Sequence, residues 1–157
     1  MKIQYKIYYI FLVLCVISAF IMAYRFLEVK DVSQEQIKNA VTQSTDVKNM
    51  NEDNGQAFRK LYGLNRRDFE QFLYYSPKSN MEANEILILK TKSDEQNKNV
   101  QETIEARIED QSDSFKNYNK EQYEILKNHT LESKSGYIIL IVSKDSDKIE
   151  KAIQELF

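Results

Sequence analysis

Residues Ile7 to Tyr24, IYYIFLVLCVISAFIMAY, form an apolar run in which Ser18 is the only non-apolar residue and no Pro, Gly or charge occurs. As a helix this run extends about 27 Å, close to the roughly 30 Å of a bilayer's hydrocarbon core. Tyr8, Tyr9 and Tyr24 lie near its ends, where aromatic side chains favour the membrane interface. Nothing downstream is apolar enough to bury such a helix on every side, so the run predicts a transmembrane helix.

The same segment has features of an export signal, because Lys2 and Lys6 give it a positively charged start. The small-residue pattern of a cleavage site is weak, and Leu14 stands where a lipoprotein signal needs a small residue before Cys15. We therefore expect an uncleaved signal-anchor over residues 1–30. Flanking charges are too even to fix its orientation, but a short tail before a long polar domain is typical of an anchor whose C-terminal domain lies outside the cell.

The remainder of the chain is long enough to bury a core without disulfides or metals. Ser33 is placed to cap a helix, and the polar residues after it predict a linker, so residues 31–54 are interpreted as a helix and linker and residues 55–157 as a globular domain. Outside the first thirty residues the chain carries 18 basic and 23 acidic side chains. This balance disfavours binding to nucleic acid or anionic lipid through bulk charge.

Apolar β-branched runs at residues 85–92 and 137–142 predict strands, with residues 131–134 as a hairpin partner of the second. Gly63 is expected to end a first short helix, and Asn65 to cap a second one that bears Phe69, Phe72 and Leu73. Helical spacing places the helix that Gly63 ends at about 57–62 and predicts further helices at about 94–116, 120–128 and 149–156. This uneven order predicts an α+β fold, a small and mainly antiparallel sheet packed with helices after the N-terminal transmembrane helix.

Scarce residue types exclude several kinds of site. His129 and Cys15 are the single histidine and cysteine, and the three glycines are too dispersed for a phosphate-binding loop. We therefore expect no metal and no cofactor. Several acids lie within residues 102–113, but a solvated helix face explains them better than a pair of catalytic carboxylates. No catalytic residue is predicted, and an enzymatic role stays uncertain.

The segment least like generic sequence is RIEDQSDSFKNYNKEQYEIL, where a guanidinium, amides and phenols follow a helix-turn-helix. One interpretation is a polar interaction surface, formed by Arg107, Gln111, Tyr118, Gln122 and Tyr123. The other is a helix elbow whose rings are buried and whose amides cap turns. An aromatic cluster leaves a similar choice between a docking patch and core; it comprises Phe58, Tyr62, Phe69, Phe72, Tyr74 and Tyr75.

An ordered set of segments carries a family resemblance. It comprises LYGL at 61–64, YYSP at 74–77, the strand EILILK, the helix end RIEDQ with Ser114, Phe115 and Tyr118, EQY at 121–123, and the strand that begins Gly136-Tyr137. Over about residues 45–157 the chain resembles the bacterial family catalogued as domain of unknown function 4358. The resemblance implies a small exported protein with its domain outside the cytoplasmic membrane. Many members are lipoproteins, and Leu14 before Cys15 departs from that pattern. No site residue carries over, because the family has no established activity.

Three functions fit these observations. The function we favour is a non-enzymatic, extracytoplasmic module that is held in the membrane by residues 7–24 and binds an envelope protein or a peptide. The alternatives are a cell-wall-directed hydrolase that uses carboxylates and a structural accessory subunit of a membrane complex. The hydrolase requires a deep cleft lined by at least two acids.

Overall fold

The computed structural model describes the backbone of residues 2–27 and 32–157, and the side chains of residues 8–22 and 32–157. The chain divides into two compact units, Met1–Asp31 and Val32–Phe157. Each unit has its own architecture, and all strands of the described chain belong to the second.

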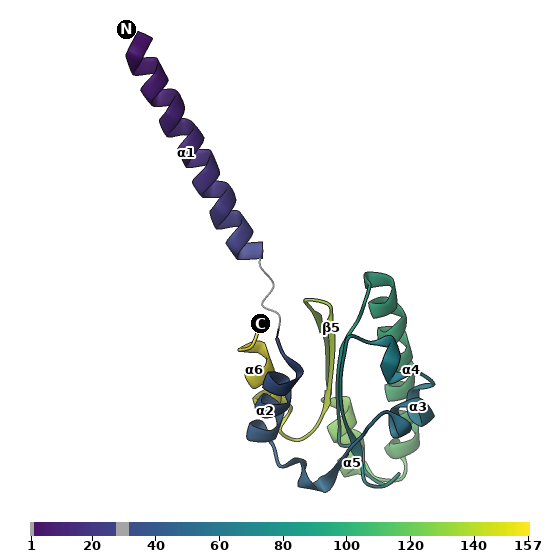
Figure 1. Cartoon of the computed structure of the whole chain (residues 1–157). Helices are drawn as coiled ribbons and strands as arrows, with labels where there is room; N and C mark the ends of the chain where they lie inside the picture. The colour runs from purple at the N-terminus through teal and green to yellow at the C-terminus, as the bar shows by residue number, and fades with distance from the viewer. Residues whose placement is uncertain (1, 28–31) are drawn as a thin grey trace. The chain divides into compact units, whose positions relative to one another are not determined.

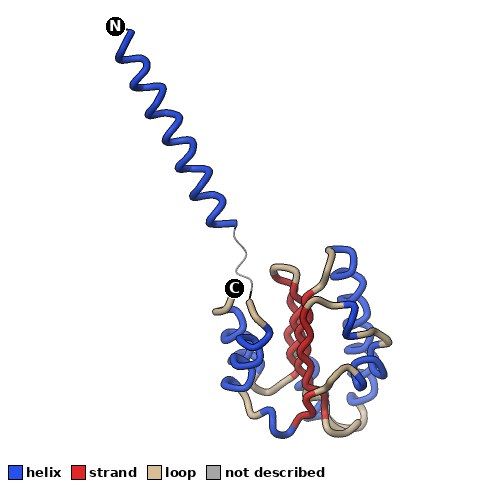
Figure 2. Tube along the Cα trace, in the orientation of Figure 1, coloured by secondary structure: helices blue, strands red, loops and turns tan. Residues whose placement is uncertain are grey.

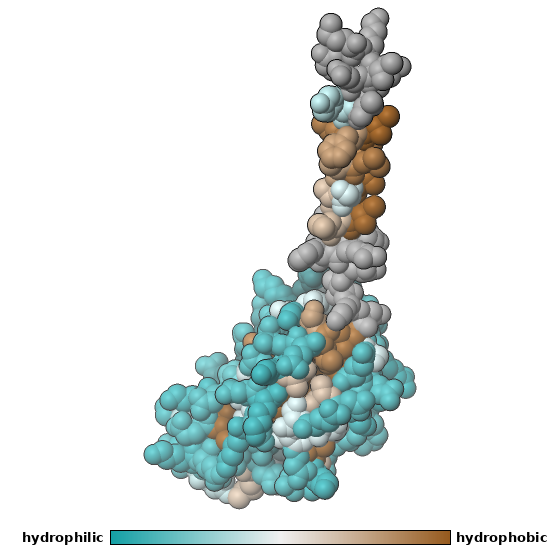
Figure 3. Space-filling view, turned by 90° about the vertical axis from the view of Figure 1, so that its left-hand side faces the viewer, coloured by the Kyte–Doolittle hydropathy of each residue, from teal (hydrophilic) through white to brown (hydrophobic). Residues whose placement is uncertain are grey.

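The first unit is the helix α1 (Lys2–Leu27). Its side chains from residue 8 to residue 22 are exposed, and most are apolar, which gives the described part of α1 its brown colour in Figure 3. The side chains of Lys2 and Lys6, expected at the charged start of the anchor, lie outside the described residues. Within the described part of the chain, no helix has the length and apolar composition that crossing a membrane requires. The transmembrane helix expected at residues 7–24 thus stays a prediction.

The second unit is built on a five-stranded sheet with the strand order β1-β2-β3-β5-β4. Its strands are β1 (Met50–Glu52), β2 (Gln71–Pro77), β3 (Glu85–Lys90), β4 (Thr130–Lys134) and β5 (Tyr137–Val142). Every neighbouring pair is antiparallel, and the central register places Leu87 opposite both Tyr74 and Leu140. The predicted α+β class, the antiparallel sheet and the hairpin between β4 and β5 are therefore confirmed.

Helices cover both faces of this sheet (Figures 1 and 2). On one face lie α2 (Gln34–Ser44) and α6 (Ser146–Gln154), and on the other α3 (Gln56–Tyr62), α4 (Asp94–Lys116) and α5 (Lys120–Lys127). Two short 3-10 turns lie between a helix and the following strand: η1 (Val47–Asn49) between α2 and β1, and η2 (Arg66–Asp68) between α3 and β2. The sheet is thus the middle layer of three.

Side chains on β3 alternate between the two helical layers. Leu87 and Leu89 pack on the face covered by α3, α4 and α5, whereas Ile86 and Ile88 pack against α2 and α6. Because successive side chains of a strand point to opposite faces, Glu85 shares the face of Leu87 and Leu89. It is 1% exposed, so the strand begins with a buried carboxyl group.

Two sequence interpretations differ from the structure. The helix expected after Asn65 is only the turn η2, and Phe72 and Leu73 lie in the strand β2. Successive side chains of this strand pack in different layers, Tyr74 on one face and Leu73 and Tyr75 on the other, and pairing with β3 outweighs the local helical spacing.

The expected polar linker is also ordered. It contains η1 and the strand β1, which pairs with β2 from Met50 opposite Pro77 to Glu52 opposite Tyr75. The helix before it, α2, buries Ile37 and Val41 in the same core as α6. The compact unit therefore begins at Val32 rather than after this stretch.

Candidate functional site

A large cleft in the second unit has a volume of about 590 Å³ and lies at one end of the α3–α4 layer. Its walls come from α3, the C-terminal half of α4, the end of β2 and the loop between β2 and β3. Local sequence fixes these walls, because the carboxylate of Asp53 accepts hydrogen bonds from the first backbone N–H groups of α3 and Gly63 ends that helix at a φ of 69°. The volume is in the range of small-ligand sites.

Arg107 of α4 forms part of the cleft wall and is held from behind by a buried acid. Its Nη2 atom lies 3.5 Å from Oε2 of Glu85, and its side chain is 15% exposed. The guanidinium also lies over the ring of Tyr62, with Cζ 5.0 Å from the ring centre, an arrangement that favours the cation. Burial opposes the charge of Arg107, but attraction to Glu85 and to Tyr62 leaves its pKa above the ordinary value. Arg107 therefore stays charged.

Two phenol groups complete the surroundings of the Glu85 carboxyl group. Tyr62 donates a hydrogen bond to Oε1 across 2.7 Å, and the hydroxyl of Tyr74 donates a short hydrogen bond to the same oxygen. Burial, followed by the negative charge of Glu85, raises the pKa of Tyr62 and of Tyr74 well above that of free tyrosine. Both phenols thus remain donors at physiological pH. We call the set Tyr62, Tyr74, Glu85 and Arg107 the buried network.

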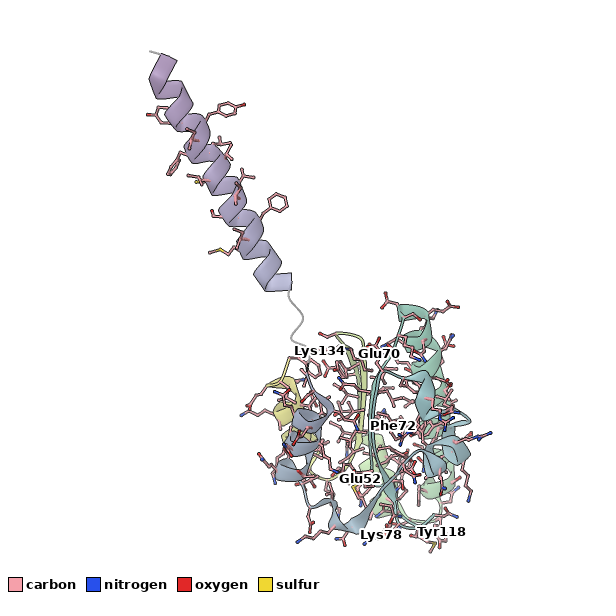
Figure 4. The ribbon with its side chains drawn as sticks, viewed as in Figure 1. Glu52, Glu70, Phe72, Lys78, Tyr118 and Lys134 are labelled. Atoms are coloured by element: carbon pink, nitrogen blue, oxygen red, sulfur yellow. The ribbon has the colours of Figure 1, made fainter. Side chains whose placement is uncertain are left out.

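The outer part of the cleft is basic and carries one apolar patch. Lys60 and Lys78 line it, together with the single acid Glu82. Tyr118 is 63% exposed and its hydroxyl donates to Sδ of Met81, which is 54% exposed. These two are the exposed large apolar side chains of residues 32–157. Figure 4 shows Lys78 and Tyr118 at the same end of the unit.

The structure separates the five residues of the predicted interaction surface. Arg107, Gln111 and Tyr118 line the cleft. Gln122 instead accepts a hydrogen bond from the backbone N–H of Ala83 across 2.7 Å, which ties α5 to the loop before β3. Tyr123 packs on the core from a partly buried position. Whether the first three bind a partner stays a prediction.

Sequence reasoning missed the acid at the centre of this site. Glu85 is the first residue of the strand predicted at residues 85–92, and the period of two places it on the same face as Leu87 and Leu89. Tyr62 and Tyr74 were assigned to an aromatic cluster, and their rings do pack on Phe58, with centroids 5.3 and 5.9 Å away. The sequence therefore contained an indication of this site. It places a carboxyl group at a core position of a buried strand, and a buried carboxyl group requires partners.

A second hollow, of about 430 Å³, has two acids in its lining, Glu52 and Asp53. Both are already engaged, because Glu52 pairs with Lys38 at 2.6 Å and Asp53 caps α3. Among the described residues, no three His, Cys, Asp or Glu side chains come close enough together to hold a metal ion.

The family model described as "Domain of unknown function (DUF4358)" matches residues 43–143, which is more than half of the chain. The chain belongs to the DUF4358 family. The match extends from the end of α2 into the residue after β5, so every residue that lines the large cleft, from Asn51 to Tyr118, lies inside the DUF4358 domain. The helices α1 and α6 lie outside it. Comparisons with curated proteins and with solved structures found no match.

Proposed function

We propose that this DUF4358 chain is a membrane-anchored, extracytoplasmic binding module that holds a segment of an envelope protein or a peptide in the large cleft. The observation that carries the proposal is the cleft itself, which is lined by a charged guanidinium that a buried acid fixes and by an exposed tyrosine that contacts a methionine. A solvated helix elbow has no need of such a buried support for one arginine.

The apolar sequence of residues 7–24 supports the anchor. Its described side chains, 8–22, are all exposed, and Ser18 is the only one among them that is not apolar. Exposed apolar surface on this scale is unfavourable in water and favourable in lipid. The resemblance to exported proteins supports an outward-facing domain.

The acids of the unit support binding rather than hydrolysis. A carboxylate-based hydrolase needs two acids held across a cleft, and Glu82 is the one acid in the lining of the large cleft. Glu85 lies behind the wall and is occupied by two phenols and Arg107. No observation on the described residues favours the hydrolase or the structural subunit over the binding module.

Location is tested by protease treatment of intact, wall-stripped cells that produce the chain with a C-terminal tag. We expect the untreated protein to sediment at full length with membranes and the tag to be lost on treatment. A tag that survives in the membrane fraction puts the domain in the cytoplasm and overturns the extracytoplasmic part of the proposal.

Binding is tested with a photoreactive phenylalanine analogue at Ser114 or Tyr118, which line the cleft. The matched control is the same analogue at Lys151, an exposed residue of α6 on the other side of the sheet. We expect both cleft positions, and not the control, to cross-link in cells to one and the same protein or peptide. Cross-linking that is equal at all three positions, or absent at both cleft positions, would contradict the proposal.

A further inference from the structure

We propose that the cleft recognises a carboxylate group of the bound peptide segment, with an apolar side chain next to it. This inference rests on the proposed function and adds the chemical class of the ligand. The guanidinium of Arg107 and the ammonium groups of Lys60 and Lys78 bind the carboxylate, and the apolar side chain packs on Met81 and Tyr118.

The charges around the cleft favour a single negative charge. Three cations, Lys60, Lys78 and Arg107, face two acids, Glu82 in the lining and Glu85 behind Arg107. One positive charge is therefore left without an acid at the site, although the unit as a whole is acidic. A carboxylate balances this charge, whereas a phosphate with two negative charges exceeds it.

Arg107 has donors to offer without moving. A guanidinium has five N–H donors, and Glu85 and the Tyr62 ring fix its plane from the core side. Its Nε atom is buried, so the donors that an incoming group can meet are those on the two Nη atoms. Because these contacts already hold the side chain in place, an incoming carboxylate avoids much of the entropy loss of ordering a long side chain.

The lysines are placed to assist from the rim. Lys78 donates one hydrogen bond, of 2.7 Å, to the carbonyl oxygen of Lys48, and an ammonium group has three donors. Lys60 lines the cleft from α3, and both lysines are exposed. Their charges draw an acid toward the cleft, where Arg107 fixes its geometry.

The apolar part of the ligand is inferred from the rim. Met81 and Tyr118 are the exposed large apolar side chains of residues 32–157, they touch each other, and Tyr118 lines the cleft that holds Arg107. Methionine and tyrosine both adapt to apolar partners at low entropic cost. Because Arg107 and Tyr118 line the same cleft, we place the acid of the ligand at Arg107 and its apolar side chain on this patch.

The test is a nuclear magnetic resonance titration of the full-length, isotope-labelled chain in detergent micelles. The probes are N-acetyl-leucine, its amide, the α-amide of N-acetyl-glutamate, and inorganic phosphate. We expect N-acetyl-leucine or the glutamate probe to shift the backbone signals of Gln111 and Tyr118 with a Kd on the order of 1 mM, and the leucine amide to bind at least about tenfold more weakly. Binding of N-acetyl-leucine would indicate that the ligand's carboxylate is at a chain end, and binding of the glutamate probe that it is on a side chain.

Variants separate binding from folding. Lys60→Gln and Lys78→Gln leave the buried network intact, and each is expected to weaken binding of the acid probe by about threefold. Arg107→Lys keeps the charge but loses the planar pair of N–H donors of the guanidinium, and about tenfold weaker binding of the acid probe is expected. Lys127→Gln removes the same charge from an exposed position on α5 outside the cleft lining and is expected to change nothing.

Three results would overturn the inference: equal binding of the acid and amide probes, wild-type binding by both lysine variants, or tighter binding of phosphate at the same signals. Cross-linking at positions 114 and 118 together with any of these leaves the proposed function standing and removes only the carboxylate. Loss of the cross-links as well removes both.

Discussion

Oε2 of Glu85 lies 3.5 Å from Nη2 of Arg107, and the Glu85 side chain is 1% exposed. This pair joins the core of the sheet to the wall of the cleft, because Glu85 starts the strand β3 and Arg107 lines the cleft from α4. A buried ion pair adds little net stability, since each charge loses its water. Its presence at the cleft indicates that it fixes the position of Arg107.

Removing one partner of this pair is expected to destabilise the fold strongly. Glu85→Gln leaves the Arg107 charge without a counter-ion, and Arg107→Met leaves the carboxylate, so each should lower the free energy of unfolding by about 3–5 kcal/mol. The double variant should lose less than the sum of the two. Urea denaturation of the chain measures all three.

The matched control is Glu52→Gln, which breaks the exposed pair with Lys38, whose side chains are 53% and 43% exposed. Its expected effect is within about 1 kcal/mol. Equal losses of unfolding free energy for Glu85→Gln and Glu52→Gln would show that the buried pair matters no more to stability than the exposed pair.

Phenol groups that donate to Glu85 should each contribute measurably. Tyr62→Phe and Tyr74→Phe remove one hydrogen bond to a charged acceptor and leave the rings in place, so we expect a loss of about 2 kcal/mol for each. Tyr118→Phe removes a hydroxyl whose partner is the sulfur of Met81 on the surface, and its effect should be small. The comparison uses urea midpoints, and three equal effects would exclude a special role for Glu85 as the acceptor.

Stability should fall at alkaline pH because of the same two phenols. Burial and the charge of Glu85 raise the pKa of Tyr62 and Tyr74 above the ordinary value of 10.0, so the unfolded chain releases these protons before the folded chain does. The contribution is complete below pH 10 and is lost as the pH rises above it. Each tyrosine adds a slope of up to about 1.4 kcal/mol per pH unit.

Urea unfolding at a series of pH values from neutral to strongly alkaline measures this slope. The variant with Tyr62→Phe and Tyr74→Phe together should show a shallower loss, since phenylalanine has no proton to release. Tyr118→Phe, at an exposed position, is the control and should keep the slope of the wild-type chain. An unchanged slope in the double variant would assign the alkaline loss to other groups.

The sequence predicted the elements whose own pattern is strong. The spans of α4 and β5 agree with their predicted bounds, and Gly63 ends α3 because glycine tolerates a positive φ there. The helix α2 was expected from Ser33, which forms a capping box with Gln36. In each case the information lies within a few residues of the element.

What the sequence did not predict depends on partners distant along the chain. The strand β2 has helical spacing of apolar residues, and only its pairing with β3 decides its conformation. The buried network likewise joins residues 62, 74, 85 and 107 from four elements. Gln122, predicted as a surface contact, meets Ala83, which is 39 residues away. Such contacts leave no periodic signal.

A fragment of residues 32–157 should fold independently, whereas one of residues 55–157 should not reach the same stability. The carbonyl oxygen of Val32 accepts hydrogen bonds from Gln71 and Tyr137, at 2.9 and 3.0 Å, so the unit is already tied to the sheet at its first residue. Starting at residue 55 removes α2, whose Ile37 and Val41 are at most 1% exposed, and also the edge strand β1.

Loss of the two buried side chains alone is expected to lower the free energy of unfolding by about 3–6 kcal/mol. That is a large share of the total stability of an ordinary domain. Urea denaturation and amide signal dispersion of the two fragments compare them directly. If the shorter fragment unfolds at the same midpoint as the longer one, α2 and β1 are appendages, and the cleft belongs to a domain that begins at α3.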